Sequence, residues 1–161
     1  MSKCLVCNIP LEILNGLGIN YSYLNENDLN KKMNELLELN SLNQGISFQH
    51  SFVFMHGYNE DEMNQITSYL KANHIDAIYA VSTPYNLQWT LNDLFNELLE
   101  EHEIFQTMHL LQALMKELIP HMNENQEIKT ILMEAFIILQ NKDLYQMKLM
   151  IQKLNSIKKS D

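Results

Sequence analysis

The first 90 residues alternate short apolar runs with amphipathic stretches. Four continuous apolar runs, at residues 4–7, 21–24, 52–55 and 77–81, have the length and bounding turns of β-strands. Two or three of them lack alternation of apolar and polar side chains, which is typical of strands covered by helices on both faces. Residues 28–39 and 60–73 carry apolar side chains at helical spacing. The pattern predicts an α/β fold with a small, mainly parallel or mixed sheet of about four strands.

A weak repeat marks the starts of three predicted helices. Each copy has an apolar residue, an Asn or Thr, and an acidic and an apolar residue three positions later; the copies begin at Leu24, Tyr58 and Trp89. The Asn or Thr can cap the helix, and the flanking apolar pair can form a hydrophobic staple. The region is therefore expected to consist of βα units. Only about ten residues separate the first two strands, which is near the minimum for a parallel crossover.

From Leu91 onward the apolar positions keep helical spacing throughout. We expect helices at residues 91–119, either continuous or broken near Glu101, at 124–140 and at 143–157. Their short connections predict antiparallel packing of consecutive helices. The predicted organisation is an α/β domain over residues 1–100 and a helical extension over 101–161, packed on the same domain or on a partner.

Composition and charge exclude several classes of protein. The 161 residues include 20 acidic residues and 11 lysines but no arginine, which gives a net charge of −9. Without arginine, and with this acidic balance, nucleic acid is not an expected partner. No apolar run approaches the roughly 18 residues of a membrane span, and no clean signal peptide precedes the first strand. We expect a soluble, cytoplasmic protein, and the many Asn, Lys and Ile residues are typical of an AT-rich bacterial genome.

The spacing of two groups of residues argues against the metal or redox roles that their side chains could otherwise have. Cys4 and Cys7 form a C-x-x-C motif, but in a strand they lie roughly 10 Å apart on opposite faces, beyond the roughly 7 Å limit for a disulfide. They are expected to be buried structural thiols. Glu97, Glu101 and His102 share a predicted helix but lack the further ligands that zinc or di-iron helices require. We therefore predict no metal, no cofactor and no catalytic residue.

A polar cleft at the ends of two strands is the first candidate site. His56 ends one predicted strand, and Thr83 and Asn86 follow the next. Open α/β sheets bind ligands at the carboxyl ends of neighbouring strands. Turn formation and helix capping explain the same residues without a ligand, so both interpretations stay open.

The segment 83–102 reads T-x-x-N-x-x-W-T-L-x-x-L-x-x-E-L-x-x-E-H. This pattern resembles the uncharacterised bacterial family known as domain of unknown function 3783. The resemblance implies a cytoplasmic bacterial protein without an assigned activity. Trp89, Thr90 and Leu94 have structural explanations as staple, cap and core residues. The polar residues that packing leaves unexplained, and that we predict to be a ligand or partner surface, are Asn86, Glu97, Glu101 and His102.

Three functions remain open at this point. The first is a non-enzymatic interaction or oligomerisation module whose helical region binds a second copy or another protein. The alternative is a small-ligand-binding or regulatory domain that uses the polar cleft at the strand ends. A metal-assisted enzyme acting through Glu97, Glu101 and His102 is the third.

Overall fold

The computed structural model describes residues 1–44 and 48–160. The chain divides into two compact units, Met1–Leu98 and Leu99–Asp161, which we call the α/β unit and the helical unit. The boundary falls within one helix, α4 (Leu91–Leu118), whose first turns belong to the α/β unit. Within the described residues, no helix is both long enough and apolar enough to cross a membrane.

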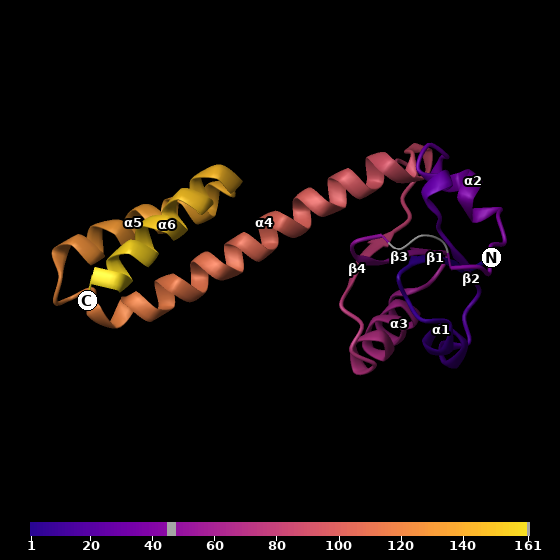
Figure 1. Cartoon of the computed structure of the whole chain (residues 1–161), viewed down its shortest axis with the longest axis horizontal. Helices are drawn as coiled ribbons and strands as arrows, with labels where there is room; N and C mark the ends of the chain where they lie inside the picture. The colour runs from indigo at the N-terminus through magenta and orange to yellow at the C-terminus, as the bar shows by residue number, and fades with distance from the viewer. Residues whose placement is uncertain (45–47, 161) are drawn as a thin grey trace. The chain divides into compact units, whose positions relative to one another are not determined.

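The α/β unit is built on a four-stranded mixed sheet (Figure 1). Its strands are β1 (Lys3–Cys7), β2 (Tyr21–Tyr23), β3 (Ser51–His56) and β4 (Ala77–Val81), in the order β2-β1-β3-β4. The pairs β1–β2 and β3–β4 are parallel, whereas β1 and β3 are antiparallel. The predicted α/β fold with a small mixed sheet is confirmed, including the short parallel crossover, which is the helix α1 (Leu11–Leu17).

Helices cover both faces of this sheet (Figure 1). On one face Val6, Val53 and Met55 pack with residues of α1 and α3 (Glu60–Ala72). On the other face Leu5 and Phe54 pack with α2 (Met33–Leu37) and the first turns of α4. Because successive strand side chains point to opposite faces, both sets must be apolar. This double burial explains the continuous apolar runs of the sequence.

The helix predicted at residues 28–39 is wrong in extent. A 3₁₀ turn (Glu26–Asp28) and the short α2 occupy this region. Lys31 and Met33, at the start of α2, bond instead with the segment that leads into α4: the Met33 amide donates to the Trp89 carbonyl (2.9 Å) and the Leu91 amide to the Lys31 carbonyl (3.0 Å). These long-range bonds occupy main-chain groups that a continuous helix would need for itself.

A buried lysine holds the end of α2 against the sheet. Lys3 of β1 is only 4% exposed, and its ammonium group donates to the carbonyls of Leu37 (2.9 Å) and Leu39 and to Asn40 Oδ1 (3.2 Å). Desolvation lowers the pKa of Lys3, and the charge of Glu38 opposes that shift. A cation at this position satisfies carbonyls that the helix end leaves without partners.

The helical unit is formed by the remainder of α4 with α5 (Gln126–Asn141) and α6 (Leu144–Ser160). Of the two alternatives near Glu101, the continuous helix is the observed one, because the residues there are helix formers without Gly or Pro. Ion pairs join Lys148 to Glu103 (2.5 Å) and Lys158 to Glu117, so α6 runs parallel to α4. The helices α4, α5 and α6 therefore form an up-down-up arrangement, and consecutive helices are antiparallel as predicted.

Candidate functional site

The predicted strand-end site lies where β3 and β4 finish side by side. The two strands pair in parallel, so their carboxyl ends lie next to each other at the same end of the sheet. His56 Nδ1 lies 2.9 Å from the hydroxyl of Ser82, the residue after β4. Topology thus brings His56 to the neighbouring strand, and its partner there is Ser82.

Thr83 and Asn86 bond to each other across the turn that follows β4. The Thr83 amide donates to Asn86 Oδ1 (2.8 Å), and the Asn86 amide donates to Thr83 Oγ1 (3.1 Å). Asn86 Nδ2 also donates to the Val81 carbonyl (3.0 Å). These reciprocal bonds give both residues a structural role in the turn that leads to α4. For Asn86, the geometry supports the turn interpretation, one of the two that the sequence left open.

The three residues assigned to the start of α4 have different environments. Thr90 Oγ1 accepts a hydrogen bond from the Asp93 amide (3.2 Å), as a helix cap does. Leu94 is 2% exposed and belongs to the core under the sheet. Trp89 is 38% exposed, so much of its indole ring remains in contact with solvent.

The acidic candidates lie along α4. Glu97 and Glu101 are exposed, and His102 is partly buried. Among the residues that the structure describes, no three His, Cys, Asp or Glu side chains are grouped so as to hold a metal ion. The structure therefore supplies no ligand set for metal-assisted chemistry at these residues.

The two thiols are buried on opposite faces of the sheet, as predicted. Cys4 packs with the α1 and α3 side and Cys7 with the α2 and α4 side, and both are free cysteines. Burial raises the pKa of Cys4 to about 11, while a hydrogen bond with Tyr58 acts in the opposite sense. Burial also raises the pKa of Cys7. Both thiols are protonated at neutral pH and are therefore poor nucleophiles.

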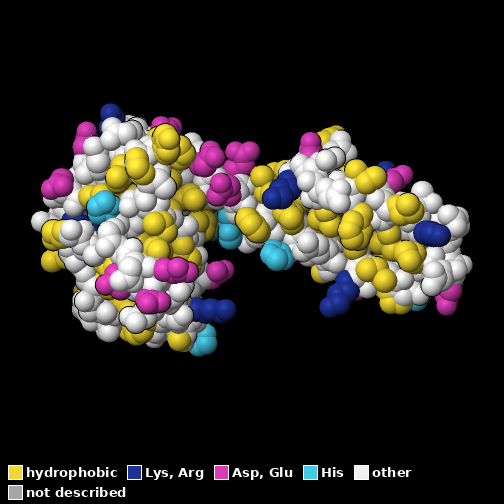
Figure 2. Space-filling view, turned by 180° about the vertical axis from the view of Figure 1, so that it is seen from behind, with side chains coloured by type: hydrophobic (Ala, Val, Ile, Leu, Met, Phe, Trp, Pro, Cys, Tyr) yellow, Lys and Arg dark blue, Asp and Glu magenta, His cyan; other side chains and the backbone are white. Residues whose placement is uncertain are grey.

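The helical unit has an apolar groove that the sequence patterns did not predict. It has a volume of about 480 Å³ and is lined by Met115, Ile119, Met122, Leu132, Met133, Phe136, Ile137 and Gln140. Figure 2 shows hydrophobic side chains gathered over this unit. Periodicity places several of these residues on helix faces, but only the packing of α4 against α5 reveals which of them remain at the surface.

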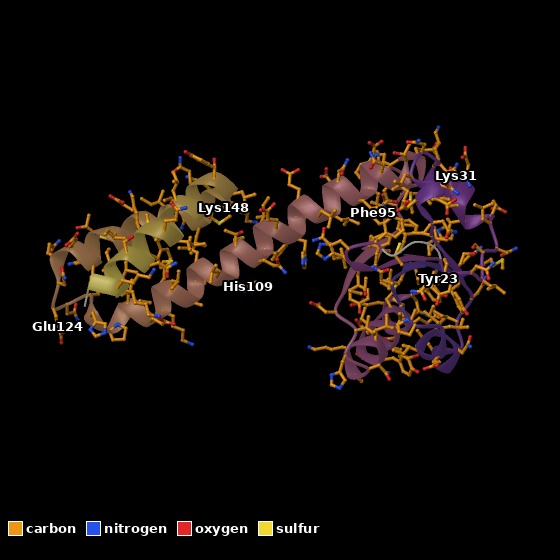
Figure 3. All side chains as sticks on the ribbon, viewed as in Figure 1. Tyr23, Lys31, Phe95, His109, Glu124 and Lys148 are labelled. Atoms are coloured by element: carbon orange, nitrogen blue, oxygen red, sulfur yellow. The ribbon has the colours of Figure 1, made fainter. Side chains whose placement is uncertain are left out.

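A polar cavity of about 470 Å³ in the α/β unit was also missed. It is lined by Asn25, Glu26, Asn27, Asp28, Lys31, Leu39, Asn40 and Ser41. Lys31 is labelled in Figure 3. Its Nζ lies 2.7 Å from Asp28 Oδ1, and Asp28 Oδ2 accepts from the Asn25 amide (2.8 Å). These contacts satisfy the buried carboxylate within the chain. In the sequence, the Asn-rich stretch at residues 25–30 is the feature that could have indicated this polar cavity.

Residues 51–105 match the model of the family described as "Domain of unknown function (DUF3783)". The matched segment runs from β3 through α3 and β4 into α4, so the resemblance carried by residues 83–102 is confirmed. No curated protein and no solved structure matches the chain.

Proposed function

We propose that this protein is a non-enzymatic interaction module of the bacterial cytoplasm that self-associates through its helical unit. The apolar groove between α4 and α5 is the observation that carries the proposal. The two buried, unpaired thiols agree with a reducing compartment.

The outer face of α5 is more apolar than the unit's own core requires. Ile128, Leu132 and Ala135 already fill the interior side of this helix. The next stripe holds Met133, Phe136 and Ile137, which are 61%, 59% and 61% exposed. Contiguous exposed apolar surface of this kind is typical of an interface with another protein.

The charge of the chain favours a second copy as the occupant. Among the described residues that line the groove, none is charged, although the chain carries a net charge of −9. Two copies can therefore bury the groove residues against each other without burying a charged lining side chain. A two-fold interface would use the same surface from each copy.

Sedimentation velocity on the full chain tests this function. We expect wild-type protein to dimerise, and Phe136→Asp to weaken the dimer at least tenfold because a charge would be buried in the contact. Asn155→Asp is the matched control, because it adds the same charge at an exposed position of α6 and leaves the dimer intact. A wild-type protein that stays monomeric at about 100 µM, a concentration at which even a Kd of 10 µM gives mostly dimer, would contradict the proposal.

A further inference from the structure

We propose that oxidation of Met133 to methionine sulfoxide separates the two copies, so that peroxide regulates the self-association surface, which is the apolar groove between α4 and α5. The inference rests on the proposed function, because it concerns the same groove. It adds a chemical signal to which the contact between copies responds.

Methionine side chains form much of the wall of this groove. Met115, Met122 and Met133 all line it. Met115 is 4% exposed and belongs to the core of the helical unit, whereas Met133 is 61% exposed. Among the described residues of this unit, Met133 is the one methionine that is exposed. An oxidant in solution therefore reaches the thioether of Met133 before those of the core.

The reaction adds one oxygen atom to the side chain. The O–O bond of hydrogen peroxide breaks, the Met133 sulfur forms a new S–O bond and loses two electrons, and the peroxide is reduced to water. The product is a polar side chain whose oxygen accepts hydrogen bonds. Methionine sulfoxide reductases convert it back to the thioether with electrons from a dithiol, which becomes a disulfide, so the change is reversible.

The groove has no hydrogen-bond donor close to this oxygen. Met133 shares one face of α5 with Phe136 and Ile137, which lie three and four residues further along the helix. Of the described lining residues, only Gln140 has an oxygen- or nitrogen-bearing side chain, and it lies about 10 Å further along the helix axis. In the free chain, water hydrates the sulfoxide oxygen. In the dimer, the oxygen would be buried without a partner, which weakens the contact.

Symmetry strengthens this effect and links oxidation to dimerisation. A two-fold interface contains Met133 of both copies, so each oxidised dimer would bury two sulfoxides. The reduced dimer also shields Met133 from peroxide, so the free chain is the form that reacts. The rate of oxidation should therefore fall as protein concentration rises, and oxidised chains should accumulate as monomers.

Peptide mass spectrometry after limited peroxide treatment of the full chain measures the oxidation of each methionine. In dilute, monomeric protein, Met133 should oxidise at least tenfold faster than Met147 and Met150, which are 0% and 1% exposed. Protein at about 100 times its dimer Kd should protect Met133 at least threefold. Met63, a partly buried residue of α3, is the internal reference and should oxidise equally fast at both concentrations. Phe136→Asp should abolish the protection of Met133.

Sedimentation velocity before and after peroxide treatment measures the effect on the dimer. Oxidation of Met133 should raise the dimer Kd at least tenfold, and a methionine sulfoxide reductase with dithiothreitol should restore the starting value. Far-UV circular dichroism should stay unchanged, which separates this effect from unfolding. Met133→Leu keeps an apolar side chain without a thioether, so peroxide should change the Kd of this variant less than twofold. Met133→Gln should weaken the dimer without peroxide, because its amide is polar.

The outcomes separate this inference from the proposed function. Wild-type protein that is monomeric before peroxide treatment would contradict both. A dimer that persists when Met133 is fully oxidised, or a Met133→Leu dimer that is as sensitive to peroxide as the wild type, would contradict the inference alone. In a protein that dimerises, oxidation of Met133 at a rate independent of concentration would place the contact outside the groove and overturn the inference.

Discussion

The two units of this chain bury their apolar side chains in different ways. The sheet of the α/β unit lies between helices, and its buried polar residues are bonded within the unit; Lys3, for example, donates to the end of α2. The helical unit has one core between three helices, and it leaves Met133, Phe136 and Ile137 more than half exposed. The contrast indicates that the sheet of the α/β unit is covered on both faces by its own helices, whereas the helical unit leaves an apolar stripe of α5 at its surface.

The largest expected effect is the loss of unfolding free energy when a phenylalanine in each unit is replaced by alanine. Phe54 is fully buried in β3, so Phe54→Ala should cost about 3–5 kcal/mol of unfolding free energy. Phe136 is 59% exposed, and Phe136→Ala should cost less than about 1 kcal/mol in dilute protein. Urea unfolding measures both. The fluorescence of Trp89, the single tryptophan, reports the α/β unit, and far-UV circular dichroism also reports the helices. Equal losses in the two variants would contradict the difference in burial.

Alkaline pH should destabilise the α/β unit selectively. Burial raises the pKa of Cys4 from 9.0 to about 11, so between these values the thiol is ionised in the unfolded chain but protonated in the folded one. The unfolded state then binds fewer protons, and stability falls as pH rises from 9 to 11. With about 1.4 kcal/mol for each pKa unit, Cys4 contributes a loss on the order of 2 kcal/mol.

Urea midpoints from Trp89 fluorescence between pH 8 and pH 11 measure this loss. Cys4→Ala is the matched variant and should reduce the pH dependence, although Cys7 still contributes because burial raises its pKa as well. The helical unit contains no cysteine, so it should lack this thiol-linked loss. A pH dependence that is identical in wild-type and Cys4→Ala protein would rule out the thiol as its source.

Sequence patterns predicted the strands because double burial produces a local signal. The apolar runs of β1 and β3 are buried on both sides, so their positions are visible without knowing their neighbours. The prediction of one helix over residues 28–39 is wrong in extent because the main chain there bonds to residues 89–92, and no local pattern encodes those bonds. At the strand ends, topology predicted that His56 would meet the next strand. The bonds between Thr83 and Asn86 depend on turn geometry, and the exposure of Phe136 depends on helix packing; spacing alone specifies neither.

The smallest expected effect concerns the cap of α4, the helix that the two units share. Thr90 Oγ1 accepts from the Asp93 amide, and Thr90→Ala should cost about 1 kcal/mol because that amide loses its partner. Thr90→Ser keeps a hydroxyl and should remain close to wild type. The loss should appear in Trp89 fluorescence, because the first turn of α4 packs in the α/β core through Leu91 and Leu94.

The circular dichroism of the same variant decides how far the units depend on each other. If the helical unit unfolds at the wild-type urea concentration in Thr90→Ala, the cap stabilises the α/β unit alone, as separate cores imply. A single transition that shifts in both signals would mean that α4 couples the units into one cooperative structure. The two separate cores would then describe how the side chains pack but not how the chain unfolds. Loss of structure in one unit would destabilise the other through the helix that they share.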